Sequence, residues 1–235
     1  MPKVNDAYRV HKRSQILDAA YKVTMNKPVY DISMSDVIKE SGLSQGGIYR
    51  YYSNLDDILI GLINRECSAD NMEAMVEGIV NQKAPPEKVL FDLFGLWKDA
   101  IFLNLISVGK IYFELVALYA DKHDKLYRFR SEINLCKQEA IFQEKSFLWI
   151  DAQVKAECFH PKITLADLMI FMATGFDGII RDMILVRQYQ AAEVFPGMAG
   201  LNADRMISNM YLAVLLLLGG NAEHFISGGY ACEDR

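Results

Sequence analysis

Paired cysteines and the common catalytic sequence motifs are missing from this chain. Four cysteines occur among 235 residues, at Cys67, Cys136, Cys158 and Cys232, without the paired spacing of a disulfide framework. Scattered thiols of this kind are typical of a reducing compartment. A phosphate-binding glycine loop, a nucleophile elbow and a Cys-x-x-Cys pair are all missing. We therefore expect neither an enzyme nor a cofactor-binding protein.

Long apolar runs are missing as well. The longest, Tyr211–Gly220, is well short of the roughly 20 residues that a membrane-spanning helix requires. The first residues lack the apolar stretch of a signal peptide. With 51% hydrophobic residues, the chain can still bury a substantial core. These features predict a soluble, cytoplasmic protein that does not contact a membrane.

One type of helical metal site has to be weighed against this expectation. Helical carboxylate enzymes use a Glu-x-x-His motif from each of two helices. The chain contains the motif once, at Glu157 and His160, directly before Pro161. An all-helical metal-carboxylate enzyme is kept as an alternative, although a single copy beside a proline falls short of the pattern of two motifs that such a site requires.

Residues 33–55 carry the most informative pattern, which starts with a short helix. Ser33 and Asp36 form a capping-box pair in front of an apolar run, so the helix is expected to begin at Met34. Gly42 suits the left-handed position that ends such a helix. A glycine turn at this point predicts a second helix close behind the first.

Ser44 can cap that second helix, in which Ile48 would pack back on the first. Two short helices joined by such a turn are the pattern of a helix-turn-helix that enters the major groove of DNA. Gln45 could contact an adenine edge, Arg50 a guanine edge or a phosphate, and tyrosine hydroxyls the phosphate oxygens.

Gly46 and Gly47 are unusual inside a helix, because each costs roughly 1 kcal/mol relative to alanine. They either let the backbone approach DNA closely or are simply tolerated in a first turn. An ordinary helical hairpin with a polar outer face is the corresponding alternative for the whole segment.

The distribution of charge agrees with a DNA-binding N-terminus. The net charge is -5, but residues 1–52 carry eight Lys and Arg against five Asp and Glu. The remaining residues carry 17 against 25, so the basic excess lies with the helix-turn-helix. A positive N-terminal arm that could lie along phosphates is predicted from Lys3, Arg9, His11, Lys12 and Arg13.

Several motifs in this region occur together at the spacing of one family. They are Arg13-x-x-Ile16-Leu17-x-Ala19-Ala20, Ser33–Ser44, Ile48-Tyr49-x-Tyr51-Tyr52 and Asp56-Asp57-Ile58-Leu59. Combined, they resemble the N-terminal domain of TetR-type (TetR/AcrR) transcriptional regulators over about the first 60 residues. By this resemblance the DNA-facing positions are Ser33, Ser35, Gln45, Gly46, Gly47, Tyr49, Arg50 and Tyr51, and we add the capping residue Ser44 to the DNA-binding set.

The resemblance implies an all-α homodimer with a three-helix helix-turn-helix head and a larger helical body for ligand binding and dimerisation. We assign residues 1–55 to the DNA-binding domain and residues 56–235 to the body. The implied function is a ligand-responsive regulator, expected to be a repressor, that binds a palindromic operator in double-stranded DNA. Binding of a small, hydrophobic or cationic effector to the body would release the operator. A DNA-bound adaptor that acts through a protein partner is the alternative.

One position departs from the family. Where a lysine is usual near the start of the fourth helix, this chain has Asn54-Leu55-Asp56. Asn54 can still cap that helix, but Leu55 cannot contact a phosphate. This particular backbone contact is therefore not expected.

The remaining residues predict long helices. The first apolar-periodic stretch ends at Ala84-Pro85-Pro86, because proline disfavours helix before it. The expected helices are Asp56–Gln82; Glu87–His123, broken near Ser107–Gly109; Asp124–Phe159; a Thr164-capped helix reaching Gln190; and Ala203–Leu218, ended by Gly219 and Gly220.

The last two of these helices predict a dimer interface. The final helix is apolar nearly all round, so it has to be covered on every side. A second subunit is one cover, through a four-helix bundle with two helices from each chain; burial inside one subunit is the other. The predicted interface residues are Leu168, Met172, Gly175, Ile179, Met206, Met210, Ala213 and Leu217.

Aromatic residues are abundant in the body, as they are in pockets for apolar ligands and also in plain helical cores. Glu114 and Asp177 interrupt apolar runs, and either would favour a cationic ligand if buried alone. Each has a local partner four residues away, Lys110 and Arg181, so helical ion pairs are the favoured explanation for both acids. The predicted ligand-binding residues are Phe94, Trp97, Tyr112, Glu114, Phe142, Trp149, Phe176 and Asp177.

Overall fold

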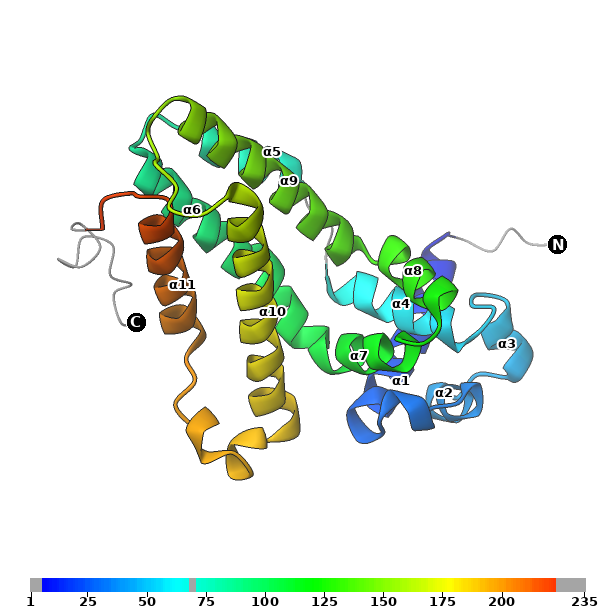
Figure 1. The fold of residues 1–235 in the computed structure, drawn as a ribbon. Coiled ribbons are helices and arrows are strands. Elements are labelled where there is room, and N and C mark those ends of the chain that lie inside the picture. The colour runs from blue at the N-terminus through cyan, green and yellow to red at the C-terminus, as the bar shows by residue number, and fades with distance from the viewer. Residues whose placement is uncertain (1–5, 68–70, 223–235) are drawn as a thin grey trace. The chain divides into compact units, whose positions relative to one another are not determined.

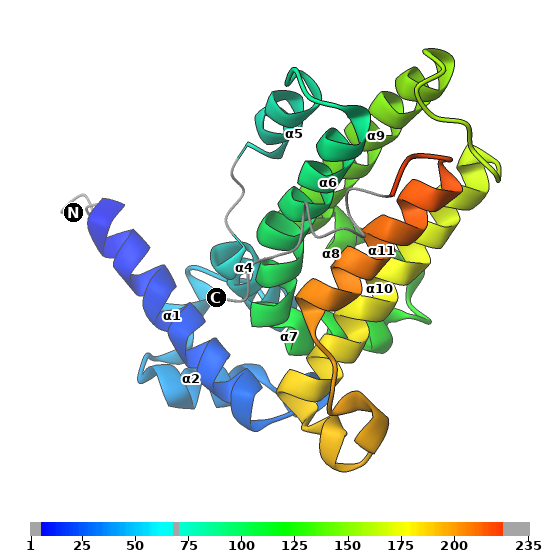
Figure 2. The ribbon, with the colours of Figure 1, turned by 90° about the vertical axis from the view of Figure 1, so that its left-hand side faces the viewer.

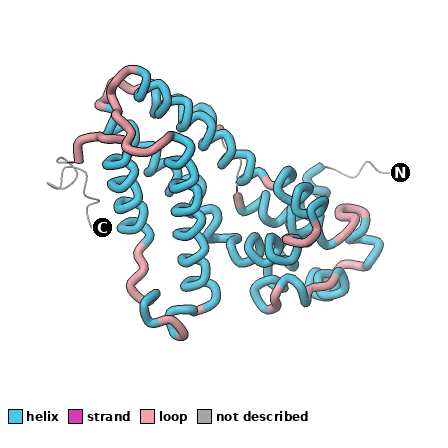
Figure 3. The backbone as a smooth tube through the Cα atoms, in the orientation of Figure 1, coloured by secondary structure: helices cyan, strands magenta, loops and turns pink. Residues whose placement is uncertain are grey.

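The computed structural model describes residues 6–67 and 71–222, of which residues 101, 103–107 and 192 are described by their backbone alone. Every regular element in these ranges is a helix (Figures 1 and 3). The predicted all-α fold class is therefore confirmed. The chain divides into two compact units. We call residues 1–69 and 107–137 the head unit, and residues 70–106 and 138–235 the body unit.

The head unit combines the N-terminal helices with a later stretch of the chain. Its core consists of fully buried aliphatic side chains, among them Ile16, Val37, Ile48 and Leu62. The helices are α1 (Asp6–Asn26), α2 (Met34–Ser41), α3 (Gln45–Tyr49), α4 (Leu55–Glu66), most of α7 (Leu103–Tyr119) and α8 (His123–Glu132), with the short η1 (Val29–Asp31) after α1.

Helix α4 joins the two parts of the head unit through polar side chains. Asn54 caps it, since its Oδ1 accepts from the Asp57 N–H at 2.9 Å, as predicted. The Tyr119 hydroxyl donates to Asp56 Oδ1 at 2.7 Å. At the other end, Asn64 Nδ2 donates to the Glu132 carbonyl and Asn64 Oδ1 accepts from the Asn134 N–H. Residues 107–137 are therefore held to both ends of α4.

The body unit is a set of packed helices with a long connection between the last two. Helices α10 and α11 lie side by side in both views (Figures 1 and 2). The elements are α5 (Met72–Val80), α6 (Pro86–Trp97), the π-helical turn η2 (Lys98–Phe102), α9 (Asn134–Lys155), α10 (Leu165–Tyr189), η3 (Ala191–Glu193), η4 (Pro196–Met198) and α11 (Ala203–Leu217).

Close packing between these helices is set by a few residues. Tyr211 is buried, with its ring edge-on to Phe91 and Phe94 at 5.3 and 5.7 Å, and its hydroxyl donates to the Glu87 carbonyl. A Cβ at Gly175 would lie 2.5 Å from Cε of Met210, so the end of the Met210 side chain would have to shift. Met210 of α11 thus packs directly against the backbone of α10 at Gly175.

Three of the predicted long helices are wrong in extent. The expected helix 56–82 is divided into α4 and α5, and the expected helix 124–159 is divided into α8 and α9 at Ile133. The break expected near 107–109 lies instead at η2. The last two helices are confirmed to within a residue, including the Thr164 cap, whose hydroxyl accepts from the Asp167 N–H.

Candidate nucleic-acid interface

Helix α2 is fixed at both ends by the residues that its sequence predicted. Ser33 Oγ accepts from the Asp36 N–H at 3.3 Å, and Asp36 Oδ2 accepts from the Ser33 N–H at 2.9 Å, which completes the capping box. Gly42 ends the helix in the left-handed conformation at φ 67°. This local geometry fixes where the turn between the two helices begins.

A lysine from outside the motif strengthens this cap. Lys27 Nζ lies 2.6 Å from Asp36 Oδ1. Hydrogen bonds from Lys27 and then from Ser33 hold the pKa of the Asp36 carboxyl well below its ordinary value. The ionised Asp36 carboxylate therefore stabilises the folded head unit fully at pH values above the ordinary carboxyl pKa. This contribution is lost as the pH falls through the lowered pKa of Asp36.

Helix α3 presents a polar surface around one buried anchor. Ser44 Oγ accepts from the Gly47 N–H at 3.2 Å and caps the helix. Ile48 is fully buried, whereas Tyr49 is 45% exposed. Gln45 and Arg50 are also exposed. Hydrogen-bond donors suited to base edges and phosphates thus lie at the exposed surface of α3 and directly after it. The buried Ile48 packs α3 against the rest of the head unit.

Most of the predicted DNA-binding residues lie at the surface of the head unit. Gly47 and Tyr51 are half-buried, and Tyr51 lines a groove with Arg13 and Tyr52. The Arg13 guanidinium lies over the Tyr52 ring, 5.4 Å from its centroid. The exposed members of the set are Ser33, Ser35, Ser44, Gln45, Gly46, Tyr49 and Arg50.

Of the basic arm, Lys3 lies outside the described residues. The remaining members, Arg9, His11, Lys12 and Arg13, belong to the first turns of α1. They are therefore presented along a helix.

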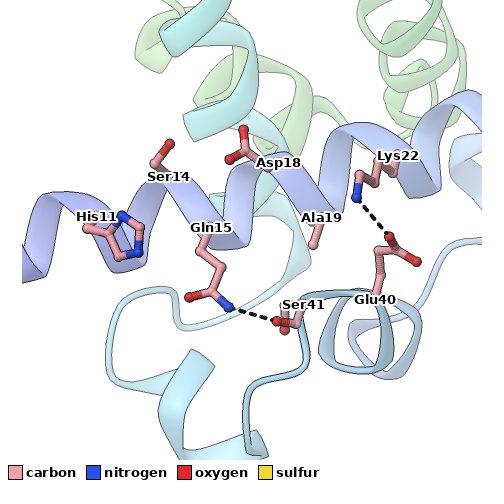
Figure 4. Close-up of a pocket in the computed structure, with 8 residues that line it drawn as sticks. All are labelled: His11, Ser14, Gln15, Asp18, Ala19, Lys22, Glu40 and Ser41. Atoms are coloured by element: carbon pink, nitrogen blue, oxygen red, sulfur yellow. Dashed lines mark hydrogen bonds and ion pairs between the residues drawn. The ribbon is translucent and has the colours of Figure 1, made fainter.

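A polar groove separates α1 from α2 (Figure 4). Gln15 Nε2 donates to the Ser41 carbonyl at 2.9 Å, and Lys22 Nζ lies 3.5 Å from Glu40 Oε1. Both side chains point from α1 towards α2 (Figure 4). These contacts orient α2 on α1, which is a structural role within the head unit.

The predicted ligand-binding residues fall into different places. Trp97, Phe142 and Phe176 line one cavity of about 270 Å³ in the body unit. Trp97 stacks on Phe176 with ring centroids 3.9 Å apart, and Phe94 lies 5.4 Å from Phe176. Trp149 instead lies edge-on to Phe159, with ring centroids 6.2 Å apart.

The two acidic candidates are placed differently from the aromatic ones. Glu114 belongs to the head unit, where Oε2 accepts from the Val29 N–H at 2.5 Å. Lys110 donates to the Thr24 and Lys27 carbonyls. Both side chains therefore bind the backbone at the end of α1 or in the connection that follows it.

Asp177 is exposed on α10, and Arg181 lies 2.9 Å from Asp182. Tyr112 contacts Phe129 within the head unit, at 5.7 Å. These residues do not line the cavity described above.

The predicted dimer residues are divided between the interior and the surface of α10 and α11. Four of them are buried within a single chain: Leu168, Met172, Ile179 and Met210. The other four, Gly175, Met206, Ala213 and Leu217, are half-buried. Their neighbours Ile170 and Leu216 are 63% and 43% exposed, so apolar surface remains on the outward side of both helices.

The Glu-x-x-His motif lies beyond the end of α9, with Glu157 in the left-handed conformation at φ 60°. Within residues 6–67 and 71–222, no three His, Cys, Asp or Glu side chains are grouped as metal ligands. None of the described helices combines the length and apolarity needed to cross a bilayer.

Comparison with known proteins locates a family match in the head unit. Residues 16–62 match the family of bacterial regulatory proteins, tetR family. The matched segment contains the whole helix-turn-helix, so the N-terminal part of the chain is similar to the DNA-binding region of TetR-type transcriptional regulators.

Two relatives come from Bacillus subtilis (strain 168). The chain is 25% identical over 196 residues to the uncharacterized HTH-type transcriptional regulator YfiR, covering 81% of this chain and 88% of the relative. It is 35% identical over 78 residues to a fatty acid metabolism regulator protein, covering 33% of this chain and 40% of the relative.

Solved structures share the fold. MexZ, a repressor from Pseudomonas aeruginosa, aligns with a TM-score of 0.55 at 20% identity, covering 91% of this chain and 97% of that one. The fatty acid degradation regulator FadR from Bacillus halodurans aligns with a TM-score of 0.50 at 18% identity, covering 88% and 94%.

A substitution at Gly46 tests the proposed DNA interface, because its effect on folding can be separated from its effect on DNA binding. A Cβ at this position would meet nothing within 4 Å, so the fold does not require glycine. Gly46→Ala should keep or raise stability, by up to about 1 kcal/mol, because alanine favours helix. If DNA approaches the backbone here, the same change should weaken DNA binding at least about fivefold, or roughly 1 kcal/mol. Thermal unfolding and fluorescence anisotropy measure the two effects.

Gly78→Ala in α5 is the matched control, since a Cβ there also meets nothing within 4 Å. It should produce a similar change in stability without changing DNA affinity. Equal DNA affinity for Gly46→Ala and the unchanged protein would mean that Gly46 is merely tolerated in the first turn.

Proposed function

We propose that this regulator binds a palindromic DNA operator as a homodimer, with α3 of each subunit in the major groove, and that it works in the cytoplasm. The observation that carries the proposal is the display of Gln45, Tyr49 and Arg50 around the buried Ile48. A two-fold operator matches a two-fold protein, because each half-site then receives the same helix. We also propose that residues 1–55 form the DNA-binding domain and residues 56–235 form the body that binds ligand and dimerises.

The dimer interface is proposed on α10 and α11. Ile170 and Leu216 expose apolar surface there, while Met210 of α11 packs against Gly175 of α10. Because half of the predicted interface residues are already covered within the chain, a second subunit would contact the half-buried ones and their exposed neighbours. Two helices from each subunit would complete a four-helix bundle.

Repression relieved by a small molecule is the proposed mode of regulation. The cavity lined by Trp97, Phe142 and Phe176 supports an apolar effector. An effector favours the conformation that it binds more tightly. The ratio of its affinities for the two conformations sets how much operator binding is lost. The fatty acid metabolism regulator matches only 33% of this chain, so its name does not define the effector.

Selection of genomic fragments bound by the full-length protein tests the proposal. We expect an enriched palindrome whose affinity falls steeply as salt rises, because each neutralised phosphate releases counterions. A flat salt response, or no enriched sequence, would contradict DNA recognition. If operator binding holds but a screen of apolar and cationic compounds leaves it unchanged, the adaptor function replaces ligand-responsive regulation.

A further inference from the structure

A single serine hydroxyl lies in the wall of the body cavity. Ser146 belongs to α9 and is only 5% exposed. Its Oγ is fully covered and has no hydrogen-bond partner among the described residues. Serine hydroxyls in helices ordinarily bond to a backbone carbonyl of the preceding turn or to solvent. An unpaired buried hydroxyl is costly, which makes this one a feature that requires explanation.

The surroundings of Ser146 are apolar apart from Gln143, whose Nε2 donates to Glu139 Oε1 at 3.2 Å. Phe142 and Ile150 lie one helical turn to either side of it on the same face of α9, and both line the cavity. The stacked rings of Trp97 and Phe176 form part of the cavity lining. A flat aromatic molecule suits such a lining, because aromatic rings attract each other in offset-stacked and edge-to-face arrangements.

Charge is missing from this site. None of the described residues that line the cavity is ionisable. The neighbouring cation, Lys145, lies 2.7 Å from carboxylate oxygens of both Glu73 and Glu77, so α5 already engages its charge. A carboxylate buried in the cavity would lack a counter-charge and is disfavoured.

We propose that the cavity binds an uncharged, flat, largely apolar molecule through one hydroxyl or carbonyl group that hydrogen-bonds to Ser146 Oγ. The inference rests on the proposed function, in which the body unit receives the effector, and it defines the chemical class of that effector. Ser146 would supply the specificity, because a pocket built to hydrogen-bond a polar group discriminates against ligands that lack it.

Matched probes test the role of the hydroxyl in the full-length protein. Calorimetric titration should show that 2-naphthol binds about tenfold more tightly than naphthalene, which has the same ring system without a hydroxyl. The anion 2-naphthoate should bind more weakly than 2-naphthol. Equal affinity for 2-naphthol and naphthalene, or tighter binding of the anion, would overturn the proposal. This test needs only the unsubstituted protein.

Ser146→Ala should abolish the preference for 2-naphthol and leave the affinity for naphthalene unchanged. Its melting temperature without ligand should rise by about 2–4 °C, because an unsatisfied buried hydroxyl is removed. Ser208→Ala, a helical serine of the body unit that does not line this cavity, is the matched control and should keep the preference. Persistence of the preference in Ser146→Ala would overturn the role of this residue.

Operator binding by the same preparations separates this inference from the proposed function. If the operator is bound but the two naphthalene probes are not distinguished, the cavity proposal fails while DNA recognition stands. If the probes are distinguished and no operator is bound, the cavity proposal stands and DNA recognition fails.

Discussion

Replacing Arg50 with alanine should weaken operator binding by about 5- to 150-fold, the equivalent of roughly 1–3 kcal/mol for a bidentate contact to guanine. Arg50 is exposed directly after α3, and it is the basic residue nearest in sequence to the fully buried Ile48. Removing it leaves the packing of α3 intact. The fold and the oligomeric state should therefore not change.

The dependence of affinity on salt shows what Arg50 contacts. Loss of a guanine contact relaxes specificity at one operator position, whereas loss of a phosphate contact weakens all sequences alike and lowers the salt slope by about 1. Binding of the operator and of single-base variants at several salt concentrations distinguishes the two. Arg187→Ala, an exposed arginine of α10, is the control and should bind like the unchanged protein. Unchanged affinity in Arg50→Ala would remove α3 from the proposed interface.

Introducing arginine at Leu216 should convert the proposed dimer to a monomer. Leu216 is 43% exposed on α11, and a two-fold interface there would bury the substituted residue twice. Burying two unpaired charges of the same sign costs several kcal/mol, enough to abolish association at micromolar concentration. Size-exclusion chromatography with light scattering gives the mass of the species. Operator affinity should fall to that for a half-site.

Leu148→Arg provides a matched control for this prediction. Leu148 is 56% exposed on α9 and lies outside the proposed interface. It tests whether added charge on an exposed leucine is disruptive by itself. A monomeric parent protein, or a dimer broken by Leu148→Arg but not by Leu216→Arg, would contradict an interface on α10 and α11.

The sequence predicts the ends of helices where a local side chain satisfies the backbone. Ser33, Ser44, Asn54 and Thr164 all accept from the N–H that their positions predicted. Gly42 likewise takes the expected left-handed conformation. Such contacts join residues two or three apart, so a linear pattern contains the necessary information.

The missed helix breaks depend on distant residues. No proline or glycine marks Ile133, and the interruption there coincides with Asn64 binding the backbone on both sides of it. Asn64 and Asn134 are 70 positions apart in the chain. Helical periodicity cannot reveal a partner at that separation. The same holds for Glu114, whose bond to the Val29 backbone joins residues 85 positions apart.

The candidate ligand site was predicted in part. Three of the aromatic residues named from composition line the cavity, yet Ser146 was missed. A signal for it exists, because Phe142, Ser146 and Ile150 recur at four-residue spacing on one buried stripe of a helix. A serine in such a stripe is a candidate for a buried polar contact.

Ile170 lies both in the wall of the cavity and on the outward side of α10, where it is 63% exposed. If a second subunit covers this side of the helix, its presence also obstructs the route by which a small molecule leaves. The dissociation rate of a bound compound should then slow as protein concentration rises. By thermodynamic reciprocity, a compound held more tightly by the dimer strengthens subunit association by the same factor.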